Sequence, residues 1–171
     1  MGNSSKEKGD RYEIASLELI KRIQHELGVT DVLRDSDLSL SGASGTSWTP
    51  DLIAYRSNQA EIAIECRFRG PRSGGVKQAD MGGFAYSLLD TGVKGIIITS
   101  RPPQKGACSI AEAEQIGVIE FQPGDSFDEY VCRTANFLRN HFFLGTSDSL
   151  ELSDECCIEL EHKDGTTRYI Q

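Results

Sequence analysis

The chain has 171 residues, 38% of them hydrophobic and 26% charged, and a formal net charge of −8. This length and composition are typical of one globular domain with one core. No apolar run approaches the roughly 20 residues that a membrane-spanning helix needs, and the polar N-terminus lacks the apolar stretch of a secretory signal. We therefore expect a cytoplasmic protein that does not contact a membrane.

The charge is unevenly distributed. Residues 1–60 carry 7 basic and 9 acidic groups, residues 61–105 carry 7 and 4, and residues 106–171 carry 4 and 13. The overall acidity argues against a non-specific nucleic-acid binder, but the middle segment is locally basic. The five cysteines are an odd number and form no C-x-x-C motif, which predicts neither a disulfide framework nor a zinc site and favours a reducing compartment.

The first half of the chain predicts one helix, three strands and one loop. In chain order these are a helix over 8–27, a strand over 29–40, a mobile Ser/Gly-rich loop over 41–47, and strands over 50–55 and 60–68. Apolar residues at helical spacing indicate the helix, and Gly28 is a natural stop. The last two strands pair as a hairpin across a turn at 56–59.

The second half alternates helices with strands. In chain order we predict a helix over 76–91, a strand over 95–100, a helix over 105–115, a strand over 118–121, a helix over 127–143, and a hairpin of 156–160 with 167–170. The near-continuous apolar run of the 95–100 strand is typical of burial on both faces. The order predicts a mixed three-layer α/β domain over 1–145, with an acidic extension over 146–171 whose hairpin packs on the same domain.

Two acidic residues on the paired strands are the most informative feature for function. Asp51 follows a proline at the start of one strand, and Glu65 follows fourteen residues later in the next. Pairing brings both carboxylates near one edge, where they suit a hard cation such as Mg²⁺, which can activate water and neutralise charge on a phosphodiester. Glu65 and Arg67 share a strand face, whereas Cys66 turns into the core.

These motifs, Pro50-Asp51 and Glu65-Cys66-Arg67, resemble the PD-(D/E)xK nuclease superfamily, with arginine in place of the family lysine. The resemblance covers roughly residues 8 to 121, and its downstream part resembles the Mrr-type restriction endonuclease branch. The downstream part is carried by Gln78, Phe84, the segment 93–100, and the helix and strand that follow. The resemblance implies a restriction-endonuclease-like three-layer αβββαβ core with a C-terminal helix and a small hairpin.

The resemblance also implies an activity: an endonuclease that uses Mg²⁺, or Mn²⁺ in its place, to hydrolyse DNA in restriction, defence or repair. It assigns metal binding to Asp51, Glu65 and the backbone carbonyl of Cys66. The implied catalytic residues are Asp51, Glu65, Arg67, Glu13 and Gln78. Family members often act as dimers or as modules of larger systems, which implies a homodimer or a partner subunit that supplies target recognition.

A basic cluster provides the expected contacts to DNA phosphates. It comprises Arg67, Arg69, Arg72 and Lys77, and its surface is extended by Lys94 and Arg101, which flank the 95–100 strand. A solvated loop is the ordinary alternative for this cluster. In the same way, Asp51 can cap a turn, Glu65 can form a structural salt bridge with Arg67 or Arg69, and Glu13 can be a solvated helix position.

Two further functions stay open. Because Arg67 cannot give up a proton at neutral pH and is not equivalent to lysine, one alternative is a nuclease-inactive DNA-binding or scaffolding subunit. The other is a protein-interaction module that uses the acidic residues of 106–171.

Overall fold

A five-stranded mixed sheet forms the centre of the protein, in the strand order β1-β4-β5-β6-β7. The computed structural model describes residues 5–25, 27–34, 37–70, 72–121, 158–161 and 167–170. The sheet strands are β1 (Asp31–Leu33), β4 (Leu52–Arg56), β5 (Gln59–Arg67), β6 (Lys94–Thr99) and β7 (Gly117–Glu120). β1, β4 and β5 pair antiparallel, whereas β5, β6 and β7 pair parallel.

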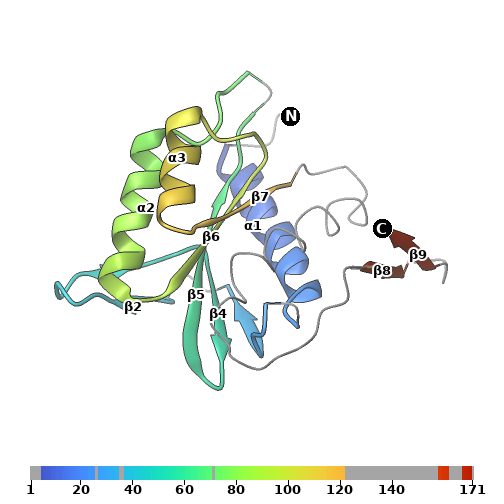
Figure 1. Ribbon diagram of the computed structural model, residues 1–171, viewed down its shortest axis with the longest axis horizontal. Coiled ribbons are helices and arrows are strands. Elements are labelled where there is room, and N and C mark those ends of the chain that lie inside the picture. Colours follow the sequence, from blue (N-terminus) through green and yellow to red (C-terminus); the bar gives the residue numbers. More distant parts are fainter. Residues whose placement is uncertain are drawn as a thin grey trace.

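Helices cover both faces of the sheet (Figure 1). They are α1 (Ser5–Arg22), α2 (Gln78–Thr91) and α3 (Lys105–Ala113). Alternate residues of β5 face opposite layers: Ile64 lies in the same core cluster as Ile20 of α1, whereas Ala63 lies in the cluster of Phe84 of α2. The predicted mixed α/β fold is therefore confirmed for the described residues. None of the helices in this part of the chain is long and apolar enough to cross a membrane.

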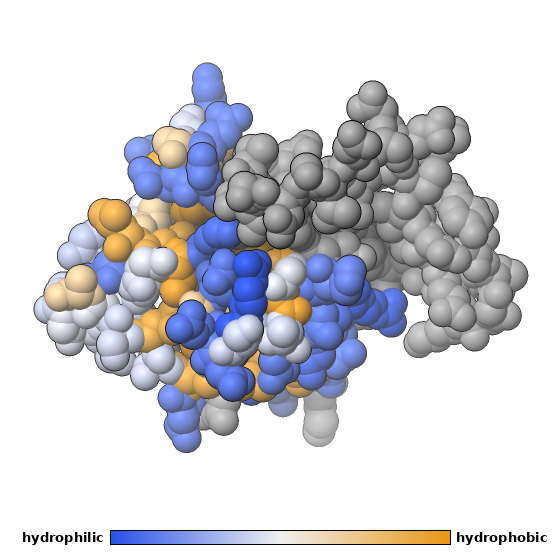
Figure 2. All heavy atoms as spheres, turned by 60° about the horizontal axis from the view of Figure 1, so that its bottom comes forward, coloured by the Kyte–Doolittle hydropathy of each residue, from blue (hydrophilic) through white to orange (hydrophobic). Residues whose placement is uncertain are grey.

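Hydrophilic and hydrophobic residues are mixed on the surface of the described residues. Figure 2, which turns the bottom of Figure 1 toward the reader, shows hydrophilic and hydrophobic residues interspersed on this face. The large hydrophobic side chains that reach the surface are scattered over several elements, Leu89 of α2 being the most exposed at 78%. Scattered exposure of this kind is ordinary in a folded domain.

The predicted central hairpin and the buried strand are both confirmed. β4 and β5 pair through a two-residue turn in which Ser57 and Asn58 have φ values of 49° and 66°, as expected for the turn type whose twist matches a hairpin. A β-bulge interrupts the ladder between Ala54 and Tyr55. β6 is buried over all residues after Lys94, as its apolar run predicts.

Three predictions for the first fifty residues are wrong. Helix α1 ends at Arg22, and the predicted strand over 29–40 is divided between β1 and β2 (Leu40–Ser41). The Ser/Gly-rich stretch is a small hairpin of β2 with β3 (Ser47–Trp48), not a loop without secondary structure. The physical reason is a distant partner, because Asp90 at the end of α2 accepts hydrogen bonds from Ala43, Ser44 and Trp48.

The C-terminal hairpin is confirmed as a pair of antiparallel strands, β8 (Ile158–Glu161) and β9 (Thr167–Ile170). The predicted helix over 127–143, the turn at 163–165 and the boundary between 145 and 146 lie outside the described residues.

Candidate functional site

The pairing of β4 with β5 brings the two acidic residues together. Leu52 pairs with Ile64, so the next positions toward the end of the hairpin, Asp51 and Glu65, lie opposite each other. The Asp51 Oδ2 atom accepts a hydrogen bond of 2.7 Å from the backbone N–H of Cys66. This bond continues the ladder through a side chain and fixes the position of the Asp51 carboxylate at the sheet edge.

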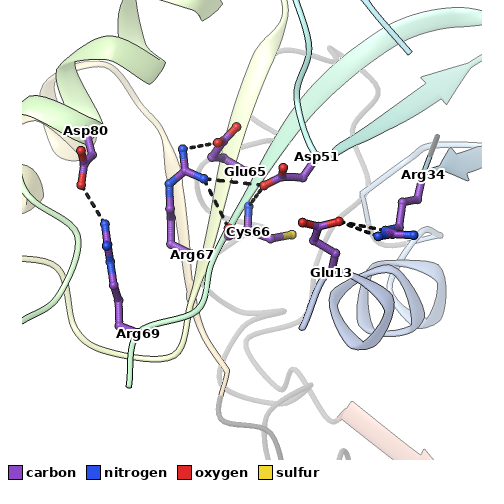
Figure 3. Close-up of polar contacts among 8 residues, drawn as sticks. All are labelled: Glu13, Arg34, Asp51, Glu65, Cys66, Arg67, Arg69 and Asp80. Carbon is purple, nitrogen blue, oxygen red and sulfur yellow. Dashed lines mark hydrogen bonds and ion pairs between the residues drawn. The ribbon is translucent and has the colours of Figure 1, made fainter. Parts of the chain in front are cut away.

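The guanidinium of Arg67 lies where three oxygen atoms converge (Figure 3). Its Nη2 forms an ion pair with Glu65 Oε1, and its Nη1 lies 3.9 Å from Asp51 Oδ2. Nη1 also donates a long hydrogen bond, 3.5 Å, to the Cys66 carbonyl. The structure therefore gathers the two carboxylates and the carbonyl around one positive charge, and their role as metal ligands stays a prediction.

Burial and mutual repulsion make the negative charge of this pair unfavourable. Burial, followed by the Asp51 charge, raises the pKa of Glu65 to about 7, although the charge and hydrogen bond of Arg67 lower it in part. The pKa of Asp51 is also raised by burial, against the hydrogen bond from Cys66. A site in which two carboxyl groups resist ionisation favours the binding of a proton or a cation.

Glu13 approaches the pair from α1 but is held by another residue. Its Oε2 atom accepts hydrogen bonds from Arg34 Nε and Nη2 at 3.0 and 2.8 Å, and its charge contributes to the raised pKa of Asp51. Figure 3 shows Glu13 between Arg34 and Asp51. Within the described ranges, no three side chains of His, Cys, Asp or Glu are grouped so as to hold a metal ion. Glu13 is therefore a neighbour of the pair that is paired with Arg34, and its catalytic role stays a prediction.

The Cys66 thiol is part of the core, as its position in the strand predicts. The side chain is 8% exposed and packs in the cluster that includes α1. Burial raises the pKa of the thiol, so the sulfur stays protonated and unreactive.

The predicted basic and polar residues have different surroundings. Gln78 is exposed at the start of α2, and its Oε1 lies where a side chain on Gly106 of α3 would be, so its contact is with α3. Arg69 donates to Asp80 Oδ2 at 2.9 Å, which neutralises part of its charge. Arg72 and Lys77 are exposed on the segment that follows β5.

Lys94 does not extend the basic surface, so that prediction is wrong. In the parallel pairing of β5 with β6, Lys94 lies beside Ile62, whereas Arg67 lies beside Thr99 at the other end. The Lys94 Nζ atom is 3.6 Å from Glu61, near the β4–β5 turn. Strand β6 begins with Lys94 at the end of the sheet that is remote from the site. Arg101 follows the other end of β6, which lies beside Arg67.

Three features of the site were not predicted from the sequence. The first is Lys105, which is exposed at the first turn of α3. The second is that α2 and α3 both begin beyond the ends of β5 and β6, where Arg67 lies beside Thr99. The third feature is a cavity adjoining Glu65, walled by Trp48 and Phe84 among others. The presence of a single tryptophan, three residues before Asp51, was the signal available for the cavity.

Comparisons with known proteins inform the fold only. No family model matches the sequence, and no curated protein matches it. Among solved structures, the chain is similar to a crystal structure of a protein of unknown function, AF1548, with 16% sequence identity and a TM-score of 0.50. The alignment covers 71% of this chain and 65% of that chain, so this chain spans less than two thirds of the other protein's length. Similarity at this level of identity shows a shared mixed α/β fold.

Proposed function

We propose that this protein is a metal-dependent nuclease that hydrolyses DNA phosphodiester bonds, of the PD-(D/E)xK type that its motifs resemble and with a restriction-endonuclease-like fold. The observation that supports the proposal is the convergence of Asp51, Glu65 and the Cys66 carbonyl at one sheet edge. Two carboxylates with one backbone oxygen suit Mg²⁺ or Mn²⁺, which take their remaining ligands from water and substrate phosphate.

A bound divalent cation would supply Lewis acidity to the phosphate and make water a better nucleophile. Asp51 and Glu65 would hold it, because their oxygens are already directed to one point. Arg67 has a side chain that is 36% exposed, so its guanidinium can turn from the carboxylates toward a phosphate. There its planar donors would stabilise the negative charge that develops on the phosphate oxygens.

The surroundings of the pair fit a polyanionic substrate. Arg72, Lys77 and Lys105 are exposed on segments that follow the ends of β5 and β6. Helices α2 and α3 begin there without side-chain caps, so their first backbone N–H groups add positive potential. A DNA backbone lying along this edge would pass the acidic pair. A second copy or a partner subunit would supply target recognition.

The test is cleavage of supercoiled plasmid with Mg²⁺ or Mn²⁺. Asp51→Asn removes the charge but keeps the oxygen that accepts the Cys66 N–H bond. Glu65→Gln removes the charge of the second proposed ligand and keeps the shape of its side chain. Both are expected to lose at least about a hundredfold in rate, the order reported for loss of one strong electrostatic contact. Glu61→Gln, the same change at the other end of β5, is the matched control. Equal activity of all four proteins would refute the proposal.

The position of Arg67 supports a second candidate, a nuclease-inactive DNA-binding or scaffolding subunit. In this arrangement the guanidinium already neutralises the oxygens that a metal would need. If Arg67 is a permanent substitute for the cation, the protein will shift DNA in a gel without cutting it. Arg67→Lys separates the two functions, because a shorter-reaching point charge frees Asp51. For a nuclease, this variant is expected to bind Mn²⁺ more tightly in calorimetry than the wild type.

A further inference from the structure

A second arginine, Arg34, approaches the acidic pair from the side opposite Arg67. It directly follows β1, the edge strand that pairs with β4. Figure 3 shows the order across the site: Arg67 lies on one side of Asp51, and Glu13 and then Arg34 lie on the other. Arg67 contacts the pair directly, whereas Arg34 reaches it through Glu13.

The contact between Arg34 and Glu13 fixes one oxygen of the Glu13 carboxylate. The Nε and Nη2 atoms of Arg34 both donate to Glu13 Oε2, at 3.0 and 2.8 Å. Because the two donors belong to one planar guanidinium, they set the orientation of the carboxylate as well as its position. The other oxygen of Glu13 lies on the side of Asp51 (Figure 3). Arg34 thus holds Glu13 with one oxygen facing the acidic pair.

Electrostatic coupling also indicates that Glu13 is close to the pair. Burial has the largest effect on the pKa of Asp51 and raises it, and among the charged neighbours Glu13 has the largest effect. The effect of Glu13 exceeds that of Arg67, whose Nη1 lies 3.9 Å from Asp51 Oδ2. The Glu13 charge acts in the same direction on Glu65. Three carboxylates and two guanidinium groups therefore share this region, and the excess of one negative charge among them favours a cation.

The position of Glu13 suits an indirect contact with such a cation. In the part of the chain that the structure describes, Glu13 is not grouped with Asp51 and Glu65 closely enough to hold an ion with them. Mg²⁺ usually keeps several of its waters, and residues around a metal site act on it through hydrogen bonds to its ligands. A carboxylate that lies just beyond the two ligands can accept a hydrogen bond from one of these waters.

We propose that Arg34 is a positioning residue of the proposed cation site, which holds the Glu13 carboxylate where it accepts a hydrogen bond from a water of the bound ion. The inference rests on the proposed nuclease function. Without Arg34, the Glu13 side chain, which is 26% exposed, is free to turn into solvent. This role has a sign that separates it from simple electrostatics. A nearby positive charge alone repels a cation, whereas a positioning residue strengthens its binding.

The experiment measures Mn²⁺ binding by calorimetry on the full-length protein and on Glu13→Gln, Arg34→Gln and the double variant. Each single variant is expected to bind Mn²⁺ about tenfold more weakly, the lower end of the effect of removing a residue that orients metal ligands. The double variant should bind no more weakly than Glu13→Gln, because the two residues act as one unit. Arg34→Lys keeps the charge but lacks the paired donors, so it is expected to lose most of the same affinity.

Arg56→Gln is the matched control for the loss of one arginine. Arg56 also forms an ion pair with a glutamate, Glu61, and donates through Nε, but it lies at the other end of the hairpin. Its Mn²⁺ affinity is expected to equal that of the wild type. Unchanged or tighter binding by Arg34→Gln, or additive losses in the double variant, would overturn the positioning role and leave the metal site standing. A wild type that binds no Mn²⁺ would instead refute the proposed metal-dependent function, and this inference with it.

Discussion

Replacing Glu65 by glutamine is expected to stabilise the protein above neutral pH while removing the proposed nuclease activity. Folding raises the pKa of Glu65 from its ordinary value of 4.5 to about 7. An acid with a raised pKa binds more protons in the folded state, so the stability of the wild type falls as the pH rises from about 4.5 to about 7. Glutamine imitates the protonated acid and does not titrate.

The size of the effect follows from the two pKa values. At about 1.4 kcal/mol for each tenfold change in proton affinity, the ionised Glu65 costs about 3 kcal/mol of the free energy of unfolding at pH 8. The Glu65→Gln variant is therefore expected to be more stable than the wild type by up to about 3 kcal/mol at pH 8. Near pH 4.5 the difference should almost vanish, because the wild-type side chain is then protonated in the folded state.

Urea titrations followed by Trp48 fluorescence, without divalent metal, measure this difference at several pH values. Glu61→Gln on the same strand is the control for the loss of one acid. A Glu65→Gln variant that is no more stable at pH 8, or whose advantage does not change with pH, would refute the reasoning. If the proposed metal site exists, adding Mg²⁺ at pH 8 is expected to raise the unfolding midpoint of the wild type but not of the variant, since only the ionised pair would bind the cation.

Three further substitutions test the packing around the site, each by urea titration. Tyr12→Phe removes the hydroxyl that donates to the buried Phe121 carbonyl at 2.9 Å, and should lower the free energy of unfolding by about 1–2 kcal/mol. An unchanged value would show that water replaces the bond. Gly75→Ala places a methyl group against the Pro102 carbonyl and should cost about 3 kcal/mol. Gly83→Ala, where a methyl group meets nothing within 4 Å, should instead stabilise α2 by about 0.5–1 kcal/mol, and the opposite order of the two would contradict the packing.

Local sequence patterns were sufficient for the central elements. The buried run of β6 and the β4–β5 hairpin were predictable because burial and turn chemistry act over a few residues. That prediction also placed Asp51 and Glu65 near each other, since a hairpin brings its two ends together. Strand alternation also placed Arg67 beside Glu65, as the structure has it, whereas the 3.9 Å distance from Arg67 to Asp51 depends on the direction of a long side chain.

Elements that depend on distant partners were not predictable in the same way. The Ser/Gly-rich stretch forms a hairpin because Asp90, 46 residues after Ser44, accepts its hydrogen bonds. The wrong position for Lys94 came from assigning both residues that flank β6, Lys94 and Arg101, to the same basic surface, although they lie at opposite ends of the strand. The direction of a parallel strand, which follows from the intervening helix α2, would have corrected that prediction.

The β-bulge of the central hairpin determines which residues of β4 and β5 lie opposite each other at the far end of the two strands. The ladder pairs Tyr55 with Ala60 and then Ala54 with Ile62, so Glu61 is an extra residue on β5. Were the ladder to run from the turn without this extra residue, Asp51 would come opposite Ile64, and the two carboxylates would point to opposite sides of the sheet. One unpaired residue near the turn, Glu61, thus sets the register that places the Asp51 and Glu65 carboxylates on the same face at the other end of the strands.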